Sequence, residues 1–147
     1  MKKIAFLVFT ALTILLTGAS AKKEPVPHIY MFGMAASFTD TIVFFTPIQQ
    51  IDSAWIDTKS ELLQERQAYS YQLRDYLNQQ QNMPHRTCIV FYSQKREKLE
   101  KKYQKMLKLY TKSKDGVQHF DVRHLDAQQF QFHVVSAEVI EEGTEEK

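Results

Sequence analysis

The stretch from Thr87 to Thr111 limits the fold more than any other part of the chain. A continuous apolar run, Cys88 to Tyr92, is followed at once by a lysine-rich segment in which apolar residues recur at helical spacing. The run predicts a buried central strand, because such a strand needs cover on both faces. The segment behind it predicts a surface helix from Gln94 to about Thr111, with Ser93 as its N-cap.

The apolar positions of this helix form one stripe. Their spacing of three or four residues puts them on the same face, so we expect that face to lie against a sheet and the lysines to face water. The stripe consists of Leu99, Tyr103, Met106, Leu107 and Tyr110.

An earlier helix is predicted from about Lys59 to Gln79. The segment Thr58 to Glu61 has the spacing of a capping box, in which the threonine hydroxyl accepts a hydrogen bond from the amide of the glutamate. The residues that recur at helical spacing and should face the sheet are Leu62, Tyr69, Leu73, Tyr76 and Leu77.

Runs rich in β-branched and aromatic residues precede this helix. The runs Ile29–Phe38 and Thr41–Thr46 predict a hairpin, whose turn at Thr39–Asp40 is wider than two residues because it lacks an Asn-Gly type pair. Gly33 marks either a bulge or a place of close approach to the backbone. Ile48 to Asp57 is expected to be irregular or a short helix.

Two further strands are predicted after the lysine-rich helix, at His119–His124 and around Phe130–Val134, where apolar and polar residues alternate. The element order is then ββαβαββ. It indicates an α/β fold, with α+β as the alternative, built on a mixed sheet of four or five strands and two long amphipathic helices. Strand–helix–strand units favour parallel neighbours.

Residues 1–21 have the pattern of a cleaved signal peptide. A lysine pair is followed by an apolar run, Ile4 to Leu16, and by small residues at Ala19–Ala21. The run is too short to span a bilayer comfortably. We therefore expect an exported bacterial protein, located in the periplasm or outside the cell, and not an integral membrane protein.

The rest of the chain reads as one domain. Residues 22–28 predict a flexible lead, 29–137 the globular domain and 138–147 an acidic tail. Cys88 is the only cysteine, so no intramolecular disulfide forms, and its place in the apolar strand predicts an inert thiol. Without the two leader lysines, basic and acidic residues are equal in number, so net charge selects no partner.

The start of the lysine-rich helix contains a conflict of charge. Lys95 and Arg96 place two cations in a first turn whose free amides are already positive. A bound phosphate, sulfate or carboxylate would offset these charges. One hypothesis is that Ser93, Lys95 and Arg96 hold an acidic group. The alternative is that Glu97 and Glu100 screen the two cations on a solvated surface.

The helix as a whole is a basic ridge. The segment from Lys95 to Lys112 contains eight Lys or Arg residues, and Lys114 follows as the ninth. The acidic residues between Lys95 and Lys114 are Glu97 and Glu100. A basic amphipathic helix can bind nucleic acid or an anionic membrane surface. Export argues against nucleic acid, and burial of the apolar stripe against the sheet argues against membrane insertion. A solvated helix face is the alternative.

A metal site at His119, Asp121 and His124 is a further hypothesis, because the first two share a predicted strand face. The spacing fits no stringent motif, and another ligand would have to come from elsewhere. The sequence indicates no cofactor.

No nucleophile elbow, phosphate-binding glycine loop or paired-carboxylate signature is found. The favoured interpretation is therefore a small exported module that binds or scaffolds, and not an enzyme. Its partner would be an anionic envelope component or another exported protein, held by the basic helix or by an open sheet edge. The alternative is a small exported hydrolase with a site at strand ends near Ser37, Asp40 and Ser93.

Overall fold

The computed structural model describes residues 22–136, so the predicted leader at 1–21 and the acidic tail at 138–147 lie outside the described residues. The elements form a mixed sheet with two helices, which confirms the predicted fold class. In chain order they are β1 (Lys23–Pro25), β2 (His28–Ala36), β3 (Ile42–Phe45), β4 (Gln49–Asp52), β5 (Trp55–Asp57), α2 (Arg66–Gln80), β6 (Thr87–Ser93), α3 (Arg96–Thr111) and β7 (Asp121–His124).

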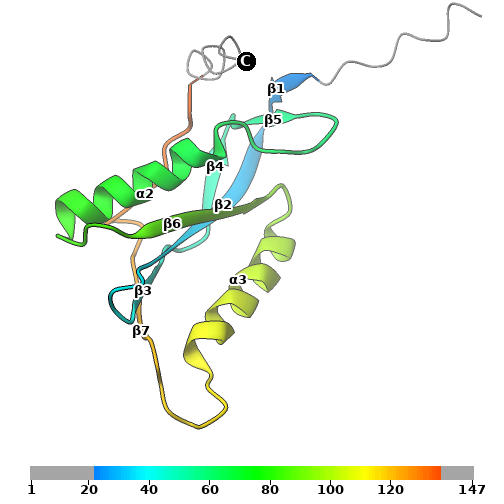
Figure 1. Ribbon diagram of the computed structural model, residues 1–147. Coiled ribbons are helices and arrows are strands. Elements are labelled where there is room, and N and C mark those ends of the chain that lie inside the picture. Colours follow the sequence, from blue (N-terminus) through cyan, green and yellow to red (C-terminus); the bar gives the residue numbers. More distant parts are fainter. Residues whose placement is uncertain (1–21, 137–147) are drawn as a thin grey trace, which may run out of the picture.

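β2 is the central strand of the main sheet (Figure 1). On one side it pairs antiparallel with all of β6, and on the other it pairs antiparallel with β4 and then β3. β7 adds to β3 in parallel. The run Cys88 to Tyr92 was predicted to be central, but it lies in an outer strand. An apolar run does not indicate which strands lie beside it. The predicted burial is also wrong in part, because Val90 is buried but Ile89 is 37% exposed at the edge of the sheet.

The strand–helix–strand units do connect parallel strands, but these strands are not neighbours. β3 and β6 are both antiparallel to β2, which lies between them. The prediction that these units produce parallel neighbours is therefore wrong. The parallel pair in the sheet, β3 with β7, joins strands that are far apart in the chain order.

Each face of the sheet buries its own core, because side chains alternate along β2. Ile29, Met31 and Ala35 face α2, and Phe32 and Met34 face α3. The two helices therefore lie on opposite faces (Figure 1). The predicted α3 stripe is confirmed, with members buried or partly buried against Phe32, Met34, Val43 and Phe45: Leu99, Tyr103, Met106, Leu107 and Tyr110.

Gly33 lies where other elements approach β2 most closely. A Cβ atom at this position would be 2.7 Å from Leu73 Cδ2 and 3.0 Å from Phe132 Cζ. The pairing of β2 with β6 continues through Gly33 without a break. The glycine therefore marks a close approach and not a bulge.

The predicted capping box does not form, and α2 begins only at Arg66. The Asp57 carboxylate accepts hydrogen bonds from the amides of residues 59 and 60, each at 2.9 Å, and closes a turn before any helix can start. Glu61 has a φ of 57°, which no α-helix allows. Leu62 was expected on the buried stripe but is 58% exposed, because it lies in this turn region and not on the helix.

Two segments that were not predicted to be strands do pair. Lys23–Pro25, expected within a flexible lead, pairs with β5 in a small separate sheet. The stretch Ile48 to Asp57 contains β4 and β5 and no helix. These strands are too short for their alternation, such as exposed Gln50, buried Ile51 and exposed Asp52, to stand out in the sequence.

The predicted last strand around Phe130–Val134 pairs with no other strand. Phe130 and Phe132 do face the α2 core, as an alternating strand would require. Side chains satisfy the backbone instead, since Gln49 bonds Phe130 O and Phe132 N, and Gln72 bonds the backbone of His133. The segment is a strap over the core and not part of the sheet.

Candidate functional site

β6 has a strand on one side only, so within residues 22–136 its other side is an open edge. Backbone groups of successive residues in a strand face opposite sides. Arg66 donates from Nε and Nη2 to the Val90 carbonyl, at 3.2 and 2.7 Å, and thereby marks the outward row. Gly33, the partner of Val90 on β2, forms its backbone hydrogen bonds with Thr46, on the side of β2 away from β6. The backbone groups of Val90 therefore also point away from β2.

The outward row of β6 therefore consists of the amides and carbonyls of Cys88, Val90 and Tyr92. The backbone groups of Ile89 and Phe91 face β2. Such a row is a template for another extended chain.

Apolar side chains are accessible at this edge. Ile89 is 37% exposed and lies on the α3 face of the sheet beyond the cover of the helix. Phe91 on the same face is half-buried and stacks on Phe32 with ring centroids 4.9 Å apart. Lys102 Nζ lies 5.3 Å from the Phe91 ring centroid, so a cation sits beside the apolar edge.

Lysines of α3 form the wall of a hollow of about 520 Å³ beside β6. With 3.6 residues per turn, Lys98, Lys102 and Lys105 share the helix flank that faces β6, whereas Glu97 and Glu100 lie on the opposite flank. No described carboxylate lines this hollow. Its lining residues are Arg66, Phe91, Tyr92, Ser93, Lys98, Leu99, Lys101, Lys102 and Lys105.

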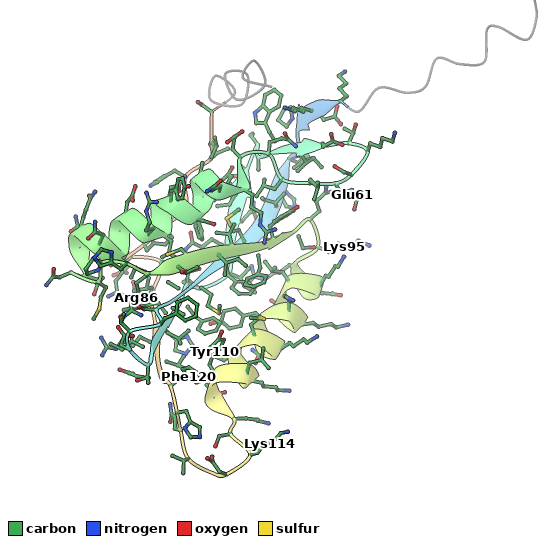
Figure 2. All side chains as sticks on the ribbon, viewed as in Figure 1. Glu61, Arg86, Lys95, Tyr110, Lys114 and Phe120 are labelled. Atoms are coloured by element: carbon green, nitrogen blue, oxygen red, sulfur yellow. The ribbon has the colours of Figure 1, made fainter. Side chains whose placement is uncertain are left out.

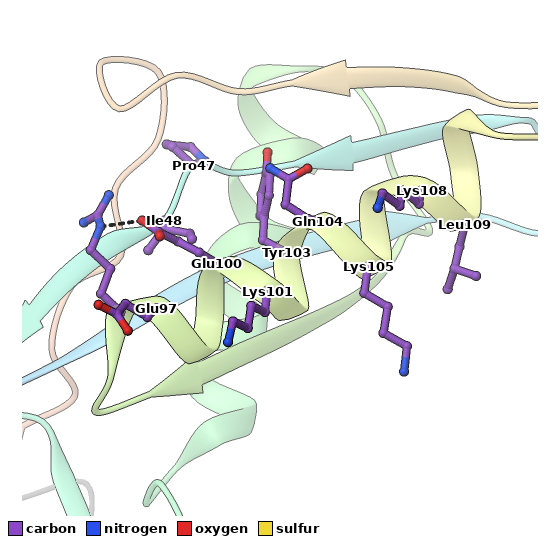
Figure 3. A pocket seen from close by; sticks show the side chains of 11 residues that line it. Pro47, Ile48, Glu97, Glu100, Lys101, Tyr103, Gln104, Lys105, Lys108 and Leu109 are labelled. Carbon is purple, nitrogen blue, oxygen red and sulfur yellow. Dashed lines mark hydrogen bonds and ion pairs between the residues drawn. The ribbon is translucent and has the colours of Figure 1, made fainter.

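The opposite flank of α3 borders a larger hollow of about 1090 Å³, with Pro47 and Ile48 as its other wall (Figure 3). Here the charges are mixed. Arg96 Nε lies 2.9 Å from Glu100 Oε1, and Glu97 lies nearby (Figure 3). The two flanks of one helix therefore differ in charge, and only the β6 flank is uniformly basic.

The structure divides the three residues of the predicted anion site. α3 begins at Arg96 with Lys95 as its N-cap and has no side-chain cap, so the prediction that Ser93 caps the helix is wrong. The Ser93 hydroxyl instead accepts a hydrogen bond from the Lys95 amide at 3.1 Å, in a turn before the helix. Arg96 turns away toward Glu100 and the Tyr30 ring.

Ser93 and Lys95 remain beside the β6 edge. Together with Tyr92 and Lys98 they line a third hollow, of about 440 Å³, on the α2 face of β6. The exposed side chain of Leu62 also lines it. Tyr92, Ser93 and Lys98 line both this hollow and the hollow of about 520 Å³ beside the α3 lysines. The two hollows therefore adjoin each other at the end of β6.

The structure does not bring the predicted metal ligands together. His119 Nε2 lies 2.8 Å from Asp115 Oδ2, the Asp121 carboxylate accepts from Arg123 at 2.8 Å, and His124 Nδ1 lies 3.3 Å from a tyrosine hydroxyl. In the part of the chain that the structure describes, no three His, Cys, Asp or Glu side chains are placed to hold a metal ion.

Ser37, Asp40 and Ser93 are not gathered either. Ser37 and Asp40 lie in the turn after β2, and Ser93 pairs with Tyr30 at the opposite end of that strand. At about 3.3 Å per residue, the length of β2 separates them by roughly 20 Å. The sequence put all three at strand ends, and the antiparallel direction of β6 sends them to opposite ends.

Asp40 has a structural partner in Arg86. Arg86 Nη2 lies 2.6 Å from Asp40 Oδ2, and Nη1 donates to the Ile42 carbonyl at 2.7 Å. The Arg86 side chain is only 2% exposed. The Ile42 amide and then Arg86 lower the pKa of Asp40. This pair fastens the β2–β3 turn to the chain that leads into β6.

Cys88 lies in the outward row of β6, with its side chain half-buried. Burial raises the pKa of its thiol to about 11. The thiolate is therefore scarce at neutral pH, as the predicted inert thiol requires.

Sequence reasoning treated the basic helix as one ridge and missed its division into flanks. The i, i+4, i+7 spacing of Lys98, Lys102 and Lys105, set against Glu97 and Glu100, carried that signal. No local pattern indicated that Arg66 would donate to the Val90 carbonyl.

The chain matches no protein-family model, no curated protein and no solved structure. Within residues 22–136, no helix combines the length and the apolar character needed to cross a membrane.

Proposed function

We propose that this protein binds an extended, acidic segment of a partner protein, which adds to the main sheet alongside β6. The observation that carries the proposal is the open edge of β6 lying directly beside a lysine-only helix flank. The amides of Cys88, Val90 and Tyr92 and the carbonyls of Cys88 and Tyr92 supply hydrogen bonds to an added strand, whereas the Val90 carbonyl already accepts from Arg66. The lysines supply charge complementarity toward carboxylates.

A polypeptide suits this surface better than a phosphate-bearing polymer or a lipid surface. Phosphates would use the lysines but leave the outward backbone row without partners, whereas an added strand uses both. The accessible Ile89 and Phe91 side chains also favour a partner that carries apolar groups.

We also propose that this binding takes place outside the cytoplasm of a bacterium. The lysine pair, the apolar run Ile4 to Leu16 and the small residues Ala19–Ala21 support export. The partner is then another exported protein or a protein of the cell envelope, and this chain acts as a binding or scaffolding module.

The test is a titration of the ¹⁵N-labelled full chain with acidic octapeptides of glutamate and valine, followed by amide chemical shifts. We expect shifts at Cys88, Val90 and Tyr92 and along Lys98 to Lys105. The double variant Lys102→Glu, Lys105→Glu should bind about tenfold more weakly, because two attractive contacts become repulsive.

The matched control is Lys112→Glu with Lys114→Glu, which changes the net charge equally. Figure 2 shows Lys114 at the far end of α3 from Lys95. This control should keep its affinity. Equal losses in both double variants would reduce the effect to overall charge. Shifts at the same residues with anionic lipid vesicles, but not with peptides, would assign the surface to membranes.

A further inference from the structure

Arg66 covers the middle of the β6 edge, and its position affects which segments can add there. We infer, on the basis of the proposed function, that the Arg66 guanidinium group on the Val90 carbonyl is a latch that decides the specificity of the edge. A carboxylate of an acidic segment draws the guanidinium group off the carbonyl and opens the latch. A neutral segment does not, and the latch excludes it.

The Val90 carbonyl is the central acceptor of the outward row. Arg66 donates to it from Nε at 3.2 Å and from Nη2 at 2.7 Å. An added strand would bring its own backbone nitrogen to about 2.9 Å from the same oxygen. The guanidinium group and the added backbone therefore compete for the space in front of this oxygen. Because Cys88 and Tyr92 lie on either side of Val90 in the row, a segment that pairs with both of them has to pass Arg66.

A neutral segment offers nothing in exchange for the two hydrogen bonds of the latch. To pair with Val90 it must break both bonds and leave the guanidinium group without an acceptor. The freed group would also remain among other cations, since no described carboxylate lines the hollow beside β6. The cations that line this hollow are Arg66, Lys98, Lys101, Lys102 and Lys105.

A carboxylate is a better acceptor for Arg66 than the Val90 carbonyl. The planar guanidinium group matches a carboxylate with two parallel hydrogen bonds, and bonds between charged groups are roughly twice as strong as neutral ones. Within residues 22–136, no carboxylate forms an ion pair with Arg66, and the first turn of α2 contains no acidic residue. A carboxylate of the added segment therefore replaces what the latch loses.

The surroundings of Arg66 keep it at the edge when it leaves the carbonyl. Its Cζ atom lies 5.8 Å from the centroid of the Tyr92 ring, which is within the range of a cation–π contact. The Tyr92 hydroxyl accepts a hydrogen bond from the Leu63 amide at 3.0 Å, and this bond fixes the ring. The guanidinium group therefore stays within reach of a segment that pairs beside Tyr92.

Arg66 and the α3 lysines contribute differently to selectivity. The lysines line the hollow and attract an acidic segment, whereas Arg66 bonds the strand backbone itself. Loss of a lysine removes an attraction toward acidic segments. Loss of Arg66 removes a penalty that falls on neutral ones, which is how a protein discriminates against the wrong partner. The two kinds of change should therefore have different effects on a neutral segment.

The experiment compares the acidic octapeptide of glutamate and valine with a peptide in which glutamine replaces every glutamate. Both are titrated into the full chain and into the variant Arg66→Gln, and the amide shifts of Cys88 and Tyr92 report binding. We expect Arg66→Gln to bind the neutral peptide about fivefold more tightly than the parent does, because the Val90 carbonyl is free. It should bind the acidic peptide no more tightly, because the carboxylates lose Arg66.

Three further variants separate the latch from charge. Lys102→Gln should weaken binding of the acidic peptide and leave the neutral peptide unchanged. Arg123→Gln removes the same charge from β7 and should change neither. Arg66→Lys keeps the charge but lacks the planar fork, so it should bind the neutral peptide more tightly than the parent does. Arg66 is exposed, and unchanged melting temperatures would verify that its variants are folded.

Two results would overturn the inference. If both Arg66 variants bind the neutral peptide no better than the parent, while the acidic peptide binds the parent, Arg66 is not a latch and the proposed function stands. If neither peptide shifts the β6 amides of the parent or of an Arg66 variant, the inference and the proposed function fail together.

Discussion

β6 and β7, two of the strands in the main sheet that have a neighbour on one side only, are protected to different degrees. β7 has four residues, and its exposed Asp121 and Arg123 side chains pair with each other at 2.8 Å. β6 has seven residues, and its Ile89 and Phe91 side chains are accessible. Short, charged edges resist the addition of another strand, whereas long apolar edges invite it. The comparison favours β6 over β7 as the edge for the binding that we propose, and the lysines beside β6 favour an acidic partner.

The wall beside β6 depends on Leu99, which anchors α3 to the sheet and is fully buried. We expect Leu99→Ala to lower the free energy of unfolding by about 2–5 kcal/mol, because it opens a cavity under the helix. Leu109 of the same helix is 61% exposed and provides the matched control. Leu109→Ala should change stability by no more than about 0.5 kcal/mol in denaturant unfolding. Similar losses in both variants would mean that α3 is not held on the sheet as described.

The strand between the two edges is sensitive to any added atom at Gly33. Gly33→Ala should destabilise the protein by about 1–3 kcal/mol, since the new methyl group would press on Leu73 and Phe132. Denaturant unfolding measures the loss. A variant as stable as the parent would show that α2 and the C-terminal strap are packed less closely than described.

Acid should weaken the Asp40–Arg86 pair, which fastens the β2–β3 turn to the chain that leads into β6. The pKa of Asp40 lies below its ordinary value of 3.8, mainly because of the Ile42 amide, and those of Asp57 and Asp115 are lowered too. A carboxyl group with a lowered folded-state pKa stabilises the fold above its unfolded pKa and loses this contribution as pH falls through the folded value. The melting temperature should therefore drop as pH falls below about 4.

The variant Asp40→Asn tests how much of this loss of stability in acid comes from the Asp40 carboxyl group. It cannot titrate, so its melting temperature should fall less steeply with acid than that of the parent. It should also be less stable at neutral pH, because Arg86 would lose its carboxylate partner. Identical pH profiles for the two proteins would assign the acid response to other groups.

The smallest expected effect comes from one charge placed on the edge itself. Ile89→Glu should weaken binding of an acidic peptide about fivefold, because it brings a like charge to the docking face. Val117→Glu is the control, since Val117 is 57% exposed and precedes β7. It should bind as the parent does. A loss of equal size there would remove the distinction between the two edges.

The sequence predicted the elements whose apolar patterns are long and local. β2, β3, β6 and the apolar stripe of α3 follow from runs and spacings that short-range packing enforces. The start of α2 could not be predicted, because it depends on Asp57 closing a turn before the helix. Strand order was also out of reach, since the run Cys88 to Tyr92 favours a strand but does not indicate which strands lie beside it, and Ile89 within the run is in fact 37% exposed.

The candidate site was predicted in part. Ser93 and Lys95 do lie in the hollow at the end of β6, but Arg96 points to Glu100. The grouping of Ser93 with Asp40 failed, because it required the direction of β6 relative to β2. That direction is fixed by contacts between residues far apart in the sequence.

Hydrogen exchange of the β6 amides in the free protein tests the open edge most directly. We expect the amides of Ile89 and Phe91, which face β2, to exchange slowly, and those of Cys88, Val90 and Tyr92 to exchange much faster. The amides of β2, which has paired strands on both sides, serve as the internal reference and should be slow without alternation. Uniformly slow exchange along β6 would contradict the account, because it would mean that the outward row already has partners.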